Sequence, residues 1–362
     1  MRHQPVIALV VAIVASGLVL PARAAVPQLP PPALSATELG LIINADDPLS
    51  VQVGDYYRQR RSIPPQNVVR IHMPRTPVLS VEEFARVKRE IDMLLPASVQ
   101  ALALAWTLPF RVSCMSATSA FAYGFSEANC ADGCRLTPSI PYFDSDSHRP
   151  YVDFRVRPAM LLAARDFDQA RRLIDRGIAS DGTAPRGTAY LMETSDKARN
   201  ARQPSFTSAL ALRRPGVDIQ IIKADVLRDR PDVLFYFTGL ITVEAIGSNH
   251  FVPGAMADHL TSAGGVLPDS YQMSSLKWLD AGATGSYGTV VEPCAFTSKF
   301  PSVPIAMRHY LAGDTLLEAY WKSVLMPSQG VFIGEPLAAP FRTISRGVEA
   351  PHEITRSRSE RN

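Results

Sequence analysis

The stretch VLFYFTGL at residues 233–240 has the pattern of a buried strand, and it opens the segment around which we expect the chain to fold. The chain continues through NHFVPGAMADHLTSAGG at 249–265 to a Gly-rich second strand, AGATGSYGTVVEP, at 281–293. Short apolar runs between turn residues are typical of strands buried on both faces of a sheet. We therefore expect the edge of the functional site between Phe235 and Pro293.

Working outward from this segment, apolar runs alternate with amphipathic helical patterns. The expected strands are 39–45, 68–74, 99–106, 187–194, 217–224 and 329–337, and the expected helices are 51–61, 80–95, 166–179, 303–313 and 315–325. In the second helix, Ser80 stands three residues before Glu83, which is a capping-box pattern. Strands alternating with helices predict a three-layer α/β/α sandwich with a mostly parallel sheet.

The domain organisation follows from composition. No Gly/Ser-rich or Pro-rich linker divides the middle of the chain, so we interpret 39–342 as one composite α/β domain. Within it, 107–158 lacks clear periodicity and is interpreted as an insertion, either a functional cover or a segment in which disulfides substitute for a core. A Pro-rich leader at 25–38 is predicted to be extended, and 343–362, rich in Arg, Ser and Glu, to be a disordered tail.

The first residues have the pattern of a secretory signal. Arg2 precedes an apolar run, and small residues at 22 and 24 predict cleavage after Ala24. A retained membrane anchor is the alternative, but the apolar run is shorter than the roughly 20 residues that span a bilayer. No later segment has the length and apolarity to span, so we predict a periplasmic or extracellular protein.

Composition and charge exclude some partners. The 362 residues are 46% hydrophobic and 20% charged, which is ordinary for a globular protein. Removal of the signal, with Arg2 and Arg23, reduces the formal charge from +3 to +1. Such a charge gives no field to attract nucleic acid or anionic lipid, so we expect neither partner. We also predict no cofactor and no bound metal.

Four cysteines, an even number, favour disulfides in an oxidising compartment. They are Cys114, Cys130, Cys134 and Cys294. The near neighbours Cys130 and Cys134 could close a small loop, which would leave Cys114 to pair with Cys294, but the sequence alone does not determine the pairing. A zinc site is the alternative, but the C-x3-C spacing has no second pair of cysteines or histidines nearby.

Seven runs make the mature chain resemble a family of secreted bacterial proteins that occur alongside exosortase-type protein-sorting systems. They are INADDPLSVQVGDYYRQRRSIPPQNVVRI, CMSATSAFAYGF, RPAMLLAARD, PGAMADHLTSAGG, GATGSYGTVVEPC, EAYWKSV and FIGEPLAAPF. This resemblance implies a place in envelope sorting or export and no particular chemistry.

A more distant resemblance is to the gingipain-like cysteine peptidases, which have a caspase-type fold. It rests on the order of VQALALAW, VLFYFTGL, ADHLTSAGG, GATGSYGTV and GEPLA. In that family one strand ends in a Gly-His-Gly turn and another strand end carries the nucleophilic Cys. Here the first position contains Thr238 and Gly239, and the second contains Thr261 and Ser262. The resemblance therefore implies a peptidase fold without its Cys–His dyad, because the dyad needs both groups within hydrogen-bond reach.

Polar residues follow several of the expected strands. Parallel sheets bind ligands outside the carboxyl ends of their strands, so we expect these residues to converge. They are Asp46, Thr238, His250, Asp258, His259, Ser262 and Glu292. In one interpretation His259 or His250 activates Ser262 for hydrolysis, with a carboxylate orienting the imidazole. In the other they have structural roles, with Asp258 and His259 on a helix surface and Ser262 in its C-terminal turn.

Two further groups have a site and a structural interpretation. Asp144, Asp146 and His148 could bind Ca²⁺, but alternating Asp and Ser is also turn chemistry, which we favour. Asp196, Arg199, Asn200 and Arg202 could bind an anion, although on a polar helix such residues are usually solvated.

Two functions remain open at this point. The leading hypothesis is a secreted relative of the peptidase fold that has lost the dyad and binds a peptide, an envelope protein or another extracellular ligand. The alternative is an active, peptidase-like hydrolase centred on Ser262. The two differ in whether a nucleophile and a base lie about 3 Å apart.

Overall fold

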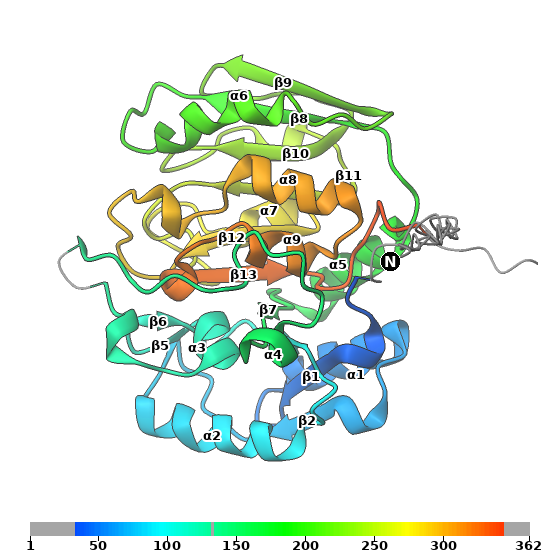
Figure 1. Ribbon diagram of the computed structural model, residues 1–362, viewed down its shortest axis with the longest axis vertical. Helices are drawn as coiled ribbons and strands as arrows, with labels where there is room; N and C mark the ends of the chain where they lie inside the picture. Colours follow the sequence, from blue (N-terminus) through cyan, green and yellow to red (C-terminus); the bar gives the residue numbers. More distant parts are fainter. Residues whose placement is uncertain (1–32, 132–133, 344–362) are drawn as a thin grey trace, which may run out of the picture. The chain divides into compact units, whose positions relative to one another are not determined.

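A computed structural model describes residues 33–131 and 134–343 of the chain. The predicted signal at 1–24, most of the leader and all but the first residue of the predicted tail lie outside the described residues. A mixed α/β architecture fills the described part (Figure 1).

A ten-stranded sheet forms the centre of this architecture, in the order β2-β1-β4-β7-β13-β12-β11-β10-β8-β9. Its strands are β1 (Leu39–Asn44), β2 (Val68–Ile71), β4 (Ala101–Leu104), β7 (Ala159–Leu161), β8 (Gly187–Glu193), β9 (Val217–Lys223), β10 (Val233–Thr238), β11 (Phe251–His259), β12 (Gly285–Thr289) and β13 (Gly330–Gly334). The expected strands are confirmed. One expectation was wrong: Asp258 and His259 lie in the buried strand β11 and not on a helix surface.

The sheet consists of two parallel blocks that run in opposite directions. Block 1 is β2-β1-β4-β7-β13 and block 2 is β12-β11-β10-β8-β9. Neighbouring strands are parallel within each block, whereas β12 and β13 pair antiparallel from Gly285↔Gly334 to Thr289↔Gly330. Block 2 lies above block 1 in Figure 1. The carboxyl ends of the two blocks therefore lie at opposite edges of the sheet.

Helices cover both faces, which confirms the three layers. They are α1 (Pro48–Arg61), α2 (Val81–Leu94), α3 (Ala117–Tyr123), α4 (Pro150–Phe154), α5 (Phe167–Ser180), α6 (Phe206–Ala209), α7 (Leu276–Ala281), α8 (Val303–Ala312) and α9 (Leu316–Lys322). The expected N-cap of α2 is confirmed, because Ser80 Oγ accepts from the Glu83 backbone N–H.

Alternating strand residues feed the separate cores of the two faces. In β1, Leu41 packs in the core of α1, whereas its neighbour Ile42 packs in the core of α2. Block 2 repeats this arrangement in β10. Phe235 contacts Tyr310 of α8, and the ring of Tyr236 lies 4.8 Å from that of Trp278 of α7. Strands buried on both faces need the near-continuous apolar runs that their sequences show.

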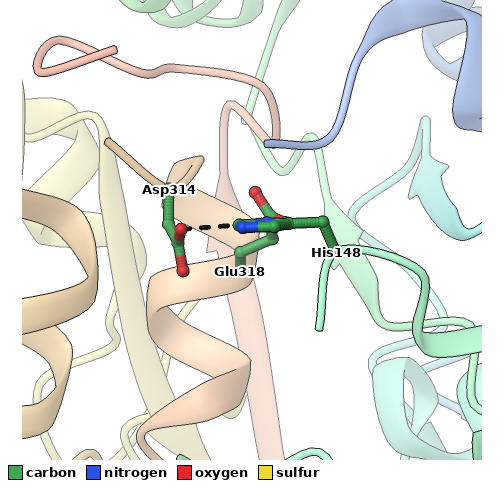
Figure 2. A group of neighbouring side chains, drawn as sticks. All are labelled: His148, Asp314 and Glu318. Atoms are coloured by element: carbon green, nitrogen blue, oxygen red, sulfur yellow. Dashed lines mark hydrogen bonds and ion pairs between the residues drawn. The ribbon is translucent and has the colours of Figure 1, made fainter. Parts of the chain in front are cut away.

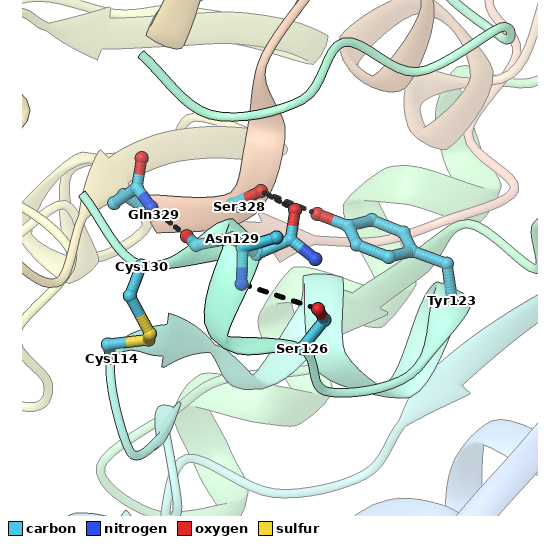
Figure 3. Close-up of a disulfide and its surroundings, with 8 residues drawn as sticks. Cys114, Tyr123, Ser126, Asn129, Cys130, Ser328 and Gln329 are labelled. Carbon is cyan, nitrogen blue, oxygen red and sulfur yellow. Dashed lines mark hydrogen bonds between the residues drawn. A yellow bond between two sulfur atoms is a disulfide. The ribbon is translucent and has the colours of Figure 1, made fainter. Parts of the chain in front are cut away.

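The insertion at 107–158 contains the strands β5 (Arg111–Val112) and β6 (Met115–Ser116), which form a small sheet with β3 (Val78–Leu79), as well as the helices α3 and α4. Asn129 fixes it to the start of β13, because its side-chain oxygen contacts Ser328 and its carbonyl accepts from Gln329 (Figure 3).

The cysteine pairing corrects our expectation. All four form disulfides, but Cys114 pairs with Cys130 (Figure 3) and Cys134 with Cys294. The second bond spans a sequence separation of 160 residues and ties the insertion to the segment after β12. The sequence spacing had suggested a Cys130–Cys134 bond because these two cysteines are close in the chain. The two disulfides fit a periplasmic or extracellular location.

In the described part of the chain, no helix combines the length and apolarity needed to cross a membrane.

Candidate functional site

The carboxyl edge of block 2 brings together loops that follow β8, β10 and β11. Gly239, directly after β10, permits a close approach: a Cβ there would lie 1.9 Å from the carbonyl oxygen of Arg199. The Gly239 carbonyl in turn accepts from Thr194 Oγ1 at 2.8 Å. The polar segment after β8 therefore packs onto the end of β10.

A buried ion pair lies beneath this edge. Arg202, in the 3-10 helix η5 (Asn200–Ser205), places Nη2 2.6 Å from Asp258 Oδ1 and donates to the Thr238 carbonyl at 2.9 Å. The two side chains are 4% and 0% exposed. Burial raises the pKa of Asp258, and the guanidinium of Arg202 opposes that rise. The expectation that Arg202 is solvated was therefore wrong.

His259 is a structural residue in this arrangement. The Trp278 indole donates to its Nδ1 at 3.0 Å, so Nε2 carries the proton and donates to the Met273 carbonyl at 3.0 Å. Burial lowers the pKa of His259 to about 3, and the positive charge of Arg202 adds to this effect. With its only lone pair held by Trp278, this imidazole is not available as a general base.

His250 and Ser262 lie at opposite ends of β11. His250 precedes the nine-residue strand and contacts the Pro231 carbonyl at 2.9 Å, whereas Ser262 follows the strand. Nine residues at about 3.3 Å each place them on the order of 30 Å apart along the strand. The pairing of Ser262 with His250 or His259, which the alternative hydrolase interpretation requires, is therefore not assembled in the structure.

The remaining predicted site residues divide between the two edges. Asp46 follows β1 of block 1 and contacts His72 at 2.7 Å, so it lies at the edge opposite Thr238 and His259. Glu292 is exposed and accepts from the Cys294 backbone N–H at 2.7 Å. We expected a single carboxyl edge because an apolar strand pattern does not indicate the direction in which the strand runs.

A groove opens beside the buried Arg202, with a cavity volume of about 310 Å³. Its apolar walls are Phe143, Ala201, Pro204, Phe300, Pro301 and Leu325. Hydroxyl groups line the rest, from Ser205, Thr297, Ser298, Ser302 and Ser323. Apolar walls with a few polar groups are typical of ligand sites. Sequence reasoning missed the groove because its walls come from distant segments, including Phe143 of the insertion.

The surface at the same edge combines polar and apolar groups. Arg199 Nε donates to Thr261 Oγ1 at 3.1 Å, and Thr261 contacts the buried Gln272. Next to these hydrogen-bonded side chains, Tyr271 is 84% exposed and Ile241 is 46% exposed. The Met273 N–H donates to the Ile241 carbonyl, which holds the two loops together.

The predicted acidic and histidine group of the insertion does not converge as a set. Asp144 pairs with Arg308 and lies 3.2 Å from His309 Nε2, and Asp146 is exposed. His148 instead faces the carboxylates of Asp314, just before α9, and Glu318, in α9. Among the described residues, only these three form a cluster of possible metal ligands.

Comparison with protein-family models, with curated proteins and with solved structures finds no match for this chain.

Proposed function

We propose that this protein binds a peptide segment, or a similar extracellular ligand with an apolar side chain, in the groove beside Arg202, and does not cleave it. The groove carries this proposal, since it combines apolar walls with hydroxyl groups at the carboxyl edge of a parallel block. The hydroxyl groups can form hydrogen bonds with the backbone of an extended peptide. The apolar walls can bury one of its apolar side chains.

The arrangement of the histidines supports binding over hydrolysis. His259 uses both ring nitrogens inside the fold, and His250 lies at the other edge. Ser262 thus has no imidazole base from either predicted partner, and a serine hydroxyl is a weak nucleophile without one. The hydrolase interpretation centred on Ser262 therefore lacks the general base that it requires from these histidines.

The expected signal and the two disulfides support a ligand in the envelope or outside the cell. The resemblance to proteins that accompany exosortase-type systems favours a role in sorting or export. Together with the resemblance to gingipain-like peptidases, the proposal describes a peptidase-type fold that retains binding without the Cys–His dyad.

Two tryptophan substitutions test the groove. Dodecapeptides selected from a phage-displayed random library on the wild-type protein are labelled, and their affinity is measured by fluorescence polarisation. Thr297→Trp fills the groove and is expected to weaken binding by at least about tenfold. Thr207→Trp is the matched control, since Thr207 is exposed on α6 and does not line the groove.

Equal weakening by both substitutions, or failure to select any peptide, would contradict binding in the groove. The same peptides are incubated with the wild type and Ser262→Ala, and the products are analysed by mass spectrometry. We expect no cleavage by either protein. Cleavage by the wild type that disappears in Ser262→Ala would restore the hydrolase interpretation.

A further inference from the structure

A second polar cluster joins the insertion to the α9 region (Figure 2). His148 Nδ1 lies 2.7 Å from Glu318 Oε1 and 3.8 Å from Asp314 Oδ1. All three candidate ligand atoms lie within 4.8 Å of one another. The side chains are 12%, 0% and 9% exposed for His148, Glu318 and Asp314. A nitrogen and two carboxylate oxygens therefore lie close together on largely buried side chains.

The second oxygen of each carboxylate forms hydrogen bonds with residues other than His148. Glu318 Oε2 accepts from the Thr315 backbone N–H and Oγ1, both at 2.9 Å. Asp314 Oδ2 contacts His309 Nδ1 at 3.0 Å and accepts from Lys322 Nζ at 2.7 Å. Such outer contacts orient the ligands of metal sites, and here they turn one oxygen of each carboxylate toward His148.

Tyr142 adds an independent observation. Its side chain is fully buried, and its hydroxyl has no hydrogen-bond partner among the described residues. Lys322 Nζ, which donates to Asp314, lies 5.5 Å from the centre of the Tyr142 ring, so Tyr142 packs next to the cluster. Burial raises the pKa of Tyr142, and the charges of Glu318 and Asp314 raise it further. A buried hydroxyl without a partner usually indicates a missing water or ion.

We propose that His148, Asp314 and Glu318 bind a divalent transition-metal ion, with Zn²⁺ as the best fit. Imidazole nitrogen and carboxylate oxygen are ordinary zinc ligands, and three protein ligands leave a position for water. The ion takes the place of the proton that His148 donates to Glu318. The Lys322 ammonium remains on the outer oxygen of Asp314, where its charge lowers the affinity without blocking the ligand atoms.

The site links segments that are distant in sequence, because His148 and Glu318 have a sequence separation of 170 residues. A bound ion would therefore fasten the insertion to α9. This inference is independent of the peptide groove, since it needs neither Arg202 nor the groove walls.

Zinc binding by the disulfide-bonded mature protein tests the proposal. The protein is stripped with a chelator, dialysed, and titrated with Zn²⁺ by calorimetry, and its metal content is measured by mass spectrometry. We expect one zinc ion per chain, and at least about tenfold weaker binding in His148→Ala. The matched control is His72→Ala, because His72 forms an exposed contact with a single carboxylate, Asp46.

Thermal unfolding with and without Zn²⁺ gives a second readout. The melting temperature of the wild type and His72→Ala is expected to rise with Zn²⁺, while that of His148→Ala stays constant. If His148→Ala fails to fold, the nearly isosteric Asp314→Asn takes its place, with the same expected loss of affinity. No zinc uptake by the wild type would leave a plain His148–Glu318 ion pair and overturn the proposal. Equal uptake by wild type and His148→Ala would overturn it as adventitious surface binding.

Discussion

Acidification should destabilise the fold through His259. In the folded protein burial lowers the pKa of this imidazole to about 3, from an ordinary value of 6.5. Between these values the unfolded chain binds a proton that the folded chain does not, so stability falls as the pH falls below 6.5. From pH 7 to pH 5, this linkage removes about 2 kcal/mol from the free energy of unfolding.

The difference between wild type and His259→Asn isolates this contribution. Asparagine keeps an acceptor for the Trp278 indole but does not titrate, while the other ionisable groups remain. Urea unfolding followed by tryptophan fluorescence gives the free energy of unfolding of both proteins at pH 7 and pH 5. The wild type should lose about 2 kcal/mol more than the variant over this range. Equal losses in the two proteins would refute the assignment of His259 as a buried neutral residue.

Two further predictions concern the packing of the site and the insertion. Gly239→Ala should lower the free energy of unfolding by more than about 2 kcal/mol, because the added Cβ would meet the Arg199 carbonyl. Gly247→Ala, where a Cβ would have no atom within 4 Å, should change it by less than about 0.5 kcal/mol. Similar costs for the two variants in urea unfolding would contradict this account. Replacing Cys134 and Cys294 by serine should cost about 2 kcal/mol more than removing the other disulfide, since the separations are 160 and 16 residues. Denaturant midpoints check this difference, and equal losses would show that loop entropy does not control it.

Local sequence was sufficient to predict most of the helices and strands. The apolar run of β10 and the Ser80 cap of α2 gave element types correctly, because burial on both faces and helix capping depend on neighbouring residues. The PGAMADH part of β11 was misjudged, since Gly254 and the alanines weaken its strand pattern.

The sequence by itself determined the layered α/β class, the alternation of strands and helices, and the cysteine content. Only the tertiary structure decided the antiparallel junction of β12 and β13, which separates Asp46 from His259, because a buried strand has the same apolar pattern in either direction. Likewise, the burial of Arg202 against Asp258 and the meeting of His148 with Glu318 depend on contacts between distant segments. Local patterns contain no information on such contacts, because the sequence does not show whether water solvates a charged residue or a buried partner of opposite charge pairs with it.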